Sequence, residues 1–271
     1  MERITTLADF YQSYDQAKHS IPNWISNFYP NPERIAALIE QGLLYHASLS
    51  STFFFLEQTT RFWRVFYCAA TPNQLENSLR ELSRQHAQQF VIDILSPTTL
   101  DAALSTALQN SGYRFYACFQ RMRLAQKNVP QRNAMAPIHC ADPEQAPQIL
   151  ALLEQAFDPL AEHLPNQTEI VAACEKQTIL LAQPEGMIAG LLFYQQARLS
   201  SELRYWWVHP DWRKQKLGSA LLYTYWQRAI QAQNHFLWVN TANQTAIEKY
   251  IHFGYTFDRL YDFIYVSPEE P

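Results

Sequence analysis

The chain has 271 residues, of which 48% are hydrophobic and 17% charged, so it is long enough for two folded domains with apolar cores. Its formal net charge of −4, without a basic stripe, argues against a nucleic-acid-binding protein. Four separated cysteines indicate neither a disulfide framework nor a metal site. Since no signal-like N-terminus or membrane-length apolar run is present, we expect a cytoplasmic protein without a membrane partner.

The first part of the chain alternates strand and helix patterns. Leucines at helical spacing within 72–88 indicate an amphipathic helix, and Asn31-Pro32 is a favourable helix start. The predicted order is helices at 6–18 and 32–41, strands at 51–56 and 62–69, a helix at 72–88, a strand at 90–95, a helix at 99–109 and a strand at 112–124. Such an order predicts an α/β fold.

Residues 126–135 lose apolar periodicity and contain Pro130, which predicts a linker between domains 1–125 and 136–271. The second domain repeats the alternation. It is predicted to contain strands at 137–140, 178–182, 187–194, 201–208, 236–240 and 255–266, and helices at 142–157, 167–175, 217 onward and 243–253.

The stretch 202–222 predicts an anion site. Pro210 ends a strand, a turn with cationic side chains follows, and a helix opens near Gly218. The first backbone N–H groups of a helix lack partners and carry partial positive charge, so a phosphate suits this junction. Gly218 removes a side chain where we expect a ligand to approach the backbone.

The run from Val208 to Ala220 resembles the acetyl-CoA pyrophosphate motif of the GNAT N-acetyltransferases, R/Q-x-x-G-x-G/A. Read from Arg213, the motif has Lys216 in place of its first glycine and Gly218 as its second. A register from Gln215 fits without a mismatch. The Arg213 register is preferred because its distance from Pro210 matches the family's V-x-P-x-x-R spacing.

A second run, Asn243 to Tyr255, resembles the family's N-x-x-A-x-x-x-Y-x-x-x-G-F/Y pattern. The resemblance implies an α/β (α+β) fold, a mixed and mostly antiparallel twisted sheet flanked by helices. The pattern of FVIDIL, helix and GYRFY in the first half parallels FLWVN, helix and GYTFD in the second, which indicates tandem GNAT-like domains. Residues 68–75 have neither a glycine nor a cationic cluster, so we expect that the first domain has lost, or never had, acetyl-CoA binding.

The resemblance implies that acetyl-CoA donates an acetyl group to a primary amine, without a metal. Glu202 is the candidate base and Tyr250 the candidate acid for the leaving thiolate; strand alternation is expected to put Glu202 on one face with Arg204, Trp206 and Val208. A salt-bridged Glu202 and a Tyr250 that only packs in the core remain open.

Cofactor contacts are expected from the backbone of the strand and from the turn. The backbone N–H groups of Trp206 and Val208 would bind the thioester carbonyl and pantetheine, and Asn243 either bonds the pantetheine arm or caps its helix. The expected pyrophosphate residues are Arg213, Lys214, Gln215, Lys216, Leu217, Gly218 and Ser219.

The acceptor, a small-molecule or peptide amine, is not identified by the sequence, and a monomer or a homodimer is expected. Lys216 and the motif-free first domain leave open a non-catalytic acyl-CoA sensor or interaction protein. An enzyme that uses another acyl or aminoacyl donor is a third reading.

Overall fold

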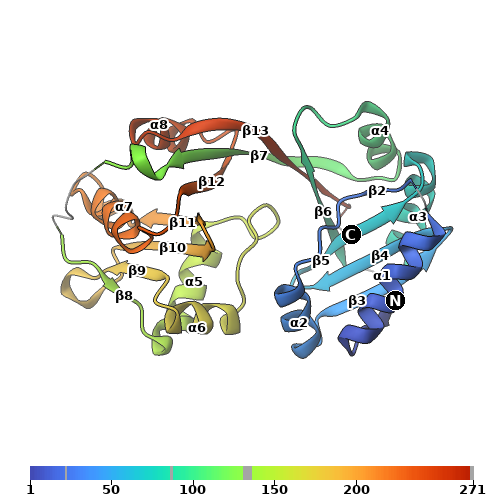
Figure 1. The fold of residues 1–271 in the computed structure, drawn as a ribbon, viewed down its shortest axis with the longest axis horizontal. Helices are drawn as coiled ribbons and strands as arrows, with labels where there is room; N and C mark the ends of the chain where they lie inside the picture. Colours follow the sequence, from blue (N-terminus) through green and yellow to red (C-terminus); the bar gives the residue numbers. More distant parts are fainter. Residues whose placement is uncertain (22, 86–87, 131–135, 269–271) are drawn as a thin grey trace. The chain divides into compact units, whose positions relative to one another are not determined.

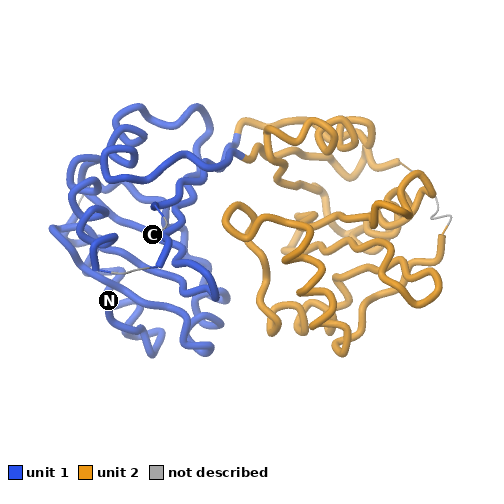
Figure 2. Tube along the Cα trace, turned by 180° about the vertical axis from the view of Figure 1, so that it is seen from behind, with its two compact units in different colours: residues 1–118, 260–271 blue, residues 119–259 orange. Residues whose placement is uncertain are grey.

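The computed structural model describes residues 1–21, 23–85, 88–130 and 136–268. The chain divides into two compact units, residues 1–118 with 260–271 and residues 119–259 (Figure 2). Within the described ranges, no helix has the length and apolar character needed to cross a membrane.

The first unit is a sheet with helices on both faces (Figure 1). Its strands lie in the order β1 (Glu2–Arg3), β3 (Leu44–Leu49), β4 (Thr52–Gln58), β5 (Phe62–Ala69), β6 (Gln89–Ser96) and β13 (Thr256–Val266), and the short β2 (Ile25–Ser26) also pairs with β5. Its helices are α1 (Leu7–Ser20), α2 (Pro32–Glu40), α3 (Pro72–Gln85) and α4 (Ala102–Asn110).

Successive phenylalanines of β4 show why both faces are covered. Phe54 packs in the cluster that contains Leu75 and Leu79 of α3, whereas Phe53 and Phe55 pack in the cluster that contains Phe10 of α1. A strand buried on both sides reads as a continuous apolar run. This explains STFFFL, although the run gave no sign of its hairpin partner β3.

The second unit has the same layers. Its strands lie in the order β7 (Arg114–Ala125), β12 (Asn234–Asn240), β11 (Ser200–Val208), β10 (Gly190–Ala197), β9 (Ile179–Ala182) and β8 (His139–Cys140). On one face, α7 (Leu217–Arg228) and α8 (Gln244–His252) pack in one cluster; on the other, α5 (Ala146–Ala156) and α6 (Gln167–Glu175) pack in another. The predicted mixed, mostly antiparallel sheet flanked by helices is confirmed.

Among the strand pairs described for each unit, one is parallel, and it is short. In the second unit β11 pairs with β12 only over Ser200–Leu203. In the first unit β5 pairs with β6 only over Phe62–Arg64. Beyond these residues the two strands of each pair are no longer hydrogen-bonded to each other. The two units therefore resemble each other also in where the sheet opens, in line with the predicted repeat.

Strand pairing assigns residues 119–125 and the C-terminal strand to other units than the predicted domain boundaries do. Residues 119–125 of β7 pair with β12, and residues 261–266 of β13 pair with β6. The compact units therefore assign 260–271 to the first unit and 119–125 to the second. The division into 1–125 and 136–271 stays a prediction, and residues 131–135 of the predicted linker lie outside the described residues.

Candidate functional site

The end of β11 presents backbone donors at the opening of the sheet. His209 donates its N–H to the Ala189 carbonyl at 2.9 Å, which continues the pairing of β11 with β10. Alternate amides of a strand point to opposite sides, so the N–H groups of Trp206 and Val208 point away from β10. Pairing with β12 has already ended at Leu203. Both amides therefore face the opening, and their binding of the thioester carbonyl and pantetheine stays a prediction.

A β-bulge at Arg204 interrupts the side-chain alternation of β11. The register with β10 shifts between Phe193 and Tyr194, which pair with Tyr205 and Leu203. Leu203 and Trp206 consequently contact the same cluster under α7 and α8, although three residues separate them. The predicted common face of Glu202, Arg204, Trp206 and Val208 is wrong, because the extra residue of the bulge reverses the phase of the strand.

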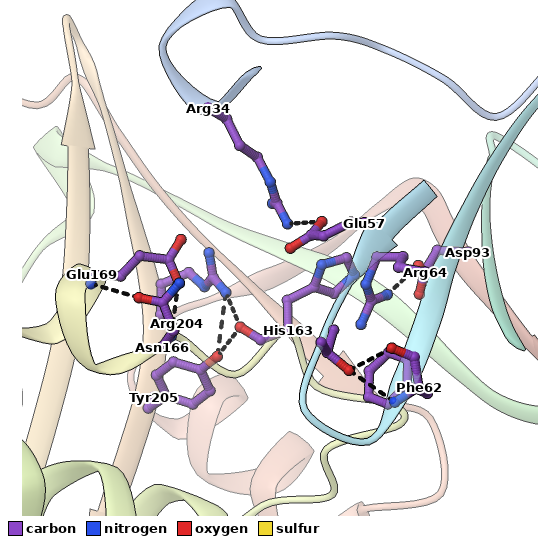
Figure 3. Close-up of polar contacts among 11 residues, drawn as sticks. Arg34, Glu57, Phe62, Arg64, Asp93, His163, Asn166, Glu169, Arg204 and Tyr205 are labelled. Carbon is purple, nitrogen blue, oxygen red and sulfur yellow. Dashed lines mark hydrogen bonds and ion pairs between the residues drawn. The ribbon is translucent and has the colours of Figure 1, made fainter. Parts of the chain in front are cut away.

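The bulge directs two neighbouring side chains to the loop between α5 and α6. Arg204 Nη2 donates to the His163 carbonyl at 2.7 Å, and the Tyr205 hydroxyl donates to the same carbonyl (Figure 3). At the end of this loop, Asn166 and Glu169 form a capping box at the start of α6. The loop is thus fixed to β11 at one point and to α6 at its end.

Glu162 lies in this loop and was missed by the sequence analysis. Burial raises the pKa of Glu162 to about 7, with Arg204 opposing the rise and Asp158 adding to it. The same carboxylate contributes to the raised pKa of Tyr250. A carboxyl group that titrates near neutrality is suited to general base chemistry. No periodicity marks Glu162 in the sequence; an acidic residue within an apolar loop was the only signal.

Glu202 has a different setting. It lies where β11 is paired on both sides, opposite Gln195 and Phe236. Its carboxylate is 3.8 Å from Arg204 Nε, which is the salt-bridge alternative that the sequence left open.

Tyr250 lies on α8 beside the opening. Its side chain is 8% exposed, and its ring centroid is 5.7 Å from that of Trp206. Burial raises the pKa of the phenol, so it stays protonated and able to donate a proton. The indole N–H of Trp206 is also buried, and within the described part of the chain it has no hydrogen-bond partner.

The cationic turn before α7 has an unusual backbone. Lys214 and Lys216 have φ angles of 65° and 63°, in the left-handed region, and Lys216 is the N-terminal flanking residue of the helix. Among described residues, none accepts a hydrogen bond from the backbone N–H groups of residues 214–219. Successive free amides at a helix start form a concave anion site. The motif's first glycine falls on Lys216 in the Arg213 register, where glycine would adopt this conformation readily.

Gly218 serves packing. A Cβ atom added there would lie 3.1 Å from the Trp206 ring and 3.4 Å from Val208. The missing side chain therefore lets α7 approach β11, and the expected reason, access of a ligand to the backbone, is not what the neighbouring atoms show.

The other expected contact residues divide by exposure. Arg213, Lys214, Gln215 and Lys216 are exposed, Ser219 is half-buried and Leu217 is buried. Arg213 Nε donates to the Val208 carbonyl at 3.3 Å, which holds the turn against the strand end. Asn243 Oδ1 accepts from the Ala246 N–H at 3.1 Å, so the helix-capping alternative is confirmed.

Comparison with known families agrees with this arrangement. Residues 143–255 match the sequence model of the acetyltransferase (GNAT) family. This part of the chain is a GNAT domain. No curated protein matches the chain in sequence.

Solved structures show the same fold over both units. A GNAT-family acetyltransferase from Colwellia psychrerythraea is similar over 98% of each chain, with 11% identity and a TM-score of 0.56. A GCN5-related N-acetyltransferase from Kribbella flavida matches 87% of this chain and 95% of its own, with 14% identity and a TM-score of 0.56. A tandem GNAT protein from the clavulanic acid biosynthesis pathway matches 81% and 79%, with 13% identity and a TM-score of 0.52. At these identities the likeness concerns the fold alone.

Proposed function

We propose that the GNAT domain transfers an acetyl group from acetyl-CoA to a primary amine of a small molecule or peptide. The observation that carries the proposal is a set of backbone amides without a partner among the described residues, those of Trp206 and Val208 on β11 and those of residues 214–219 around the start of α7. A pantetheine arm can add to the open strand, and a pyrophosphate can bind the helix start.

The reaction needs one proton acceptor and one proton donor. The base takes the ammonium proton, the amine nitrogen attacks the thioester carbonyl carbon, a C–N bond forms and the C–S bond breaks. The nitrogen loses its second proton as the amide forms, and this proton restores the Tyr250 phenol once the phenol has protonated the thiolate. Of the two candidate bases, Glu162 and Glu202, we assign the role to Glu162 because its pKa of about 7 balances proton uptake and release near neutral pH. Neutral Tyr250 gives its proton to the departing thiolate.

The amide of Trp206 or Val208 is proposed to donate to the thioester oxygen as negative charge develops on it. Fixed backbone donors stabilise such an oxyanion without reorganising. Exposed Arg213, Lys214 and Lys216 supply charge-assisted contacts to the phosphates.

The first test is cofactor binding. Ligand at 100 times its Kd stabilises the folded state by about 2.7 kcal/mol, so saturating acetyl-CoA is expected to raise the melting temperature. Gly218→Val should abolish the rise, because a larger side chain pushes α7 away from Trp206. The exposed Glu248→Val in α8 is the control. Absence of any rise for the native chain would refute the proposal.

The second test separates an enzyme from a sensor. Lysine at 216, where the motif has glycine, is the observation that favours a sensor. We expect thiol release from acetyl-CoA with at least one class in a panel of small amines, polyamines and peptide N-termini. Binding without thiol release over the whole panel would favour the sensor.

A further inference from the structure

The first unit has the same opening between parallel strands, but a segment of the chain itself lies in it. After Arg64, β5 no longer pairs with β6. Instead, β2 pairs antiparallel with the end of β5, with Ile25 opposite Ala69 and Ser26 opposite Cys68 (Figure 1). The other edge of β5 is already paired with β4 along its length. The short strand β2 therefore occupies the side from which β6 has departed.

Asn27 joins the two strands where they part. Its Nδ2 donates to the Val65 carbonyl on β5 at 2.9 Å and to the Asp93 carbonyl on β6 at 3.0 Å. Its Oδ1 accepts from the Tyr67 N–H at 2.7 Å. The side chain is 7% exposed, so these backbone groups have no access to water as an alternative.

Ser26 adds to the same arrangement. Its hydroxyl donates to the Tyr67 carbonyl at 2.7 Å and accepts from the Phe28 N–H at 3.0 Å. Both polar groups of Tyr67 on this side of β5 are therefore satisfied by residues 26 and 27.

The occupied amides correspond in position to the open ones of the second unit. Tyr67 and Ala69 are the third and fifth residues after Arg64, the last residue of β5 paired with β6. Trp206 and Val208 are the third and fifth after Leu203, the last residue of β11 paired with β12. In the second unit these amides face an opening, whereas in the first they face residues 25–27.

We infer that residues 25–28 are a built-in occupant of the first unit's strand opening, which closes that unit to acyl-CoA and leaves one acyl-CoA site per chain. The carboxamide of Asn27 makes contacts with both strands that a bound amide-rich ligand would otherwise make. Residues 68–75 contain neither a glycine nor a cationic cluster, which fits this closure, since an opening filled by the chain itself needs no phosphate contacts.

Hydrogen exchange on the full chain tests the inference amide by amide. Without ligand, the amides of Tyr67 and Ala69 are expected to be protected, and saturating acetyl-CoA should leave them unchanged. Exchange of Trp206 and Val208 reports the proposed function separately, because they should gain protection only when acetyl-CoA is added. Fast exchange of Tyr67 and Ala69 without ligand, or protection gained on adding acetyl-CoA, would overturn the inference.

Variants of Asn27 make the test specific. Asn27→Ala should speed exchange of Tyr67 by at least roughly tenfold, because its acceptor is lost. Asn27→Asp keeps an acceptor for Tyr67 but loses both donors, so it should affect that amide less. Asn23→Ala, an exposed asparagine in the same segment, is the matched control. Equal exchange in Asn27→Ala and Asn23→Ala would contradict the assignment.

Discussion

At Lys216 the structure resolves what the motif left ambiguous. A left-handed residue directly before α7 is where glycine is expected, which favours the Arg213 register over the Gln215 register. A non-glycine residue in this conformation costs about 1–2 kcal/mol. Lysine at this position therefore carries backbone strain next to the proposed phosphate site, a common feature of binding turns.

Lys216→Gly should stabilise the protein modestly. Relief of the left-handed strain outweighs the added entropy of glycine in the unfolded chain, so we expect a gain of about 0.5–1 kcal/mol in the free energy of unfolding. Chemical denaturation measures it. Lys249→Gly, at an exposed helical position of α8, should instead lose about 1 kcal/mol. Equal losses in the two variants would show that Lys216 is not strained.

Glu162 predicts a pH dependence of the reaction. The base must be deprotonated, and because burial raises the pKa of Glu162 to about 7, kcat/KM should rise as the pH increases through that value. Glu162→Gln should lower kcat by about 10²–10⁴-fold and remove the rise, since a positioned base contributes an effect of that size. Glu202→Gln is the comparison. If Glu202→Gln alone removes the rise, the base is Glu202.

At the scale of elements, the bulge of β11 determines the shape of the site. It turns Arg204 and Tyr205 toward the same carbonyl, that of His163, and so positions the loop that contains Glu162. Alternation read from the sequence could not reveal this, because a bulge adds a residue on one strand only and depends on pairing with β10. The helices α7 and α8 were predictable because the apolar spacing of both, and the Asn243 cap of α8, are local features.

Other features of the fold and of the site could be predicted from the sequence only where their causes are local. The strand opening at Trp206 and Val208 was anticipated from a motif that spans one strand, one turn and one helix. Glu162 and residues 25–28, which occupy the first unit's strand opening, were not anticipated, since each acquires its role through contacts with distant segments, such as Asn27 with Asp93. The hairpin strand β3 was missed because its outer positions are only half-buried, which weakens the pattern.

His235 of β12 predicts a pH effect on stability. Its ring is fully buried between the Tyr225 hydroxyl and Gln126, and burial lowers the pKa of His235 to about 4. In the unfolded chain His235 has its ordinary pKa of about 6.5, so it binds a proton at a higher pH than in the folded protein. The contribution of neutral His235 to the free energy of unfolding is therefore present above about pH 6.5 and is lost as the pH falls toward 4. The expected loss between pH 7 and pH 5 is about 2 kcal/mol.

Denaturation of His235→Gln at both pH values checks this effect. The variant should lose most of the difference between pH 7 and pH 5, even if it is less stable at each. His252→Gln, which removes an exposed histidine of the same unit, is the control. A pH difference that survives in His235→Gln would assign it to other groups.

At the scale of the whole molecule, the chain returns to its first unit at its C-terminal end. Tyr265 of β13 is 4% exposed within the core that contains Leu75 and Leu79 of α3, and its hydroxyl is 3.0 Å from Ser105 Oγ on α4. The sequence repeat suggested instead that each half completes its own sheet. The sequence pattern of β13 cannot show which of the two sheets it joins, because a strand with this pattern of apolar residues can pair with the edge of either sheet.

Tyr265→Ala should therefore destabilise the first unit. Truncation of a buried aromatic side chain costs about 3–5 kcal/mol, and the hydroxyl contact with Ser105 is lost as well. In hydrogen exchange on the full chain, the amides of β6, which pairs with β13, should lose protection while those of β12 keep theirs. Phe257→Ala, on the same strand but 42% exposed and within the second unit, should change β6 little. Loss of protection in β12 with β6 unaffected would instead support the division at residues 125 and 136, because the C-terminal strand would then belong energetically to the second domain.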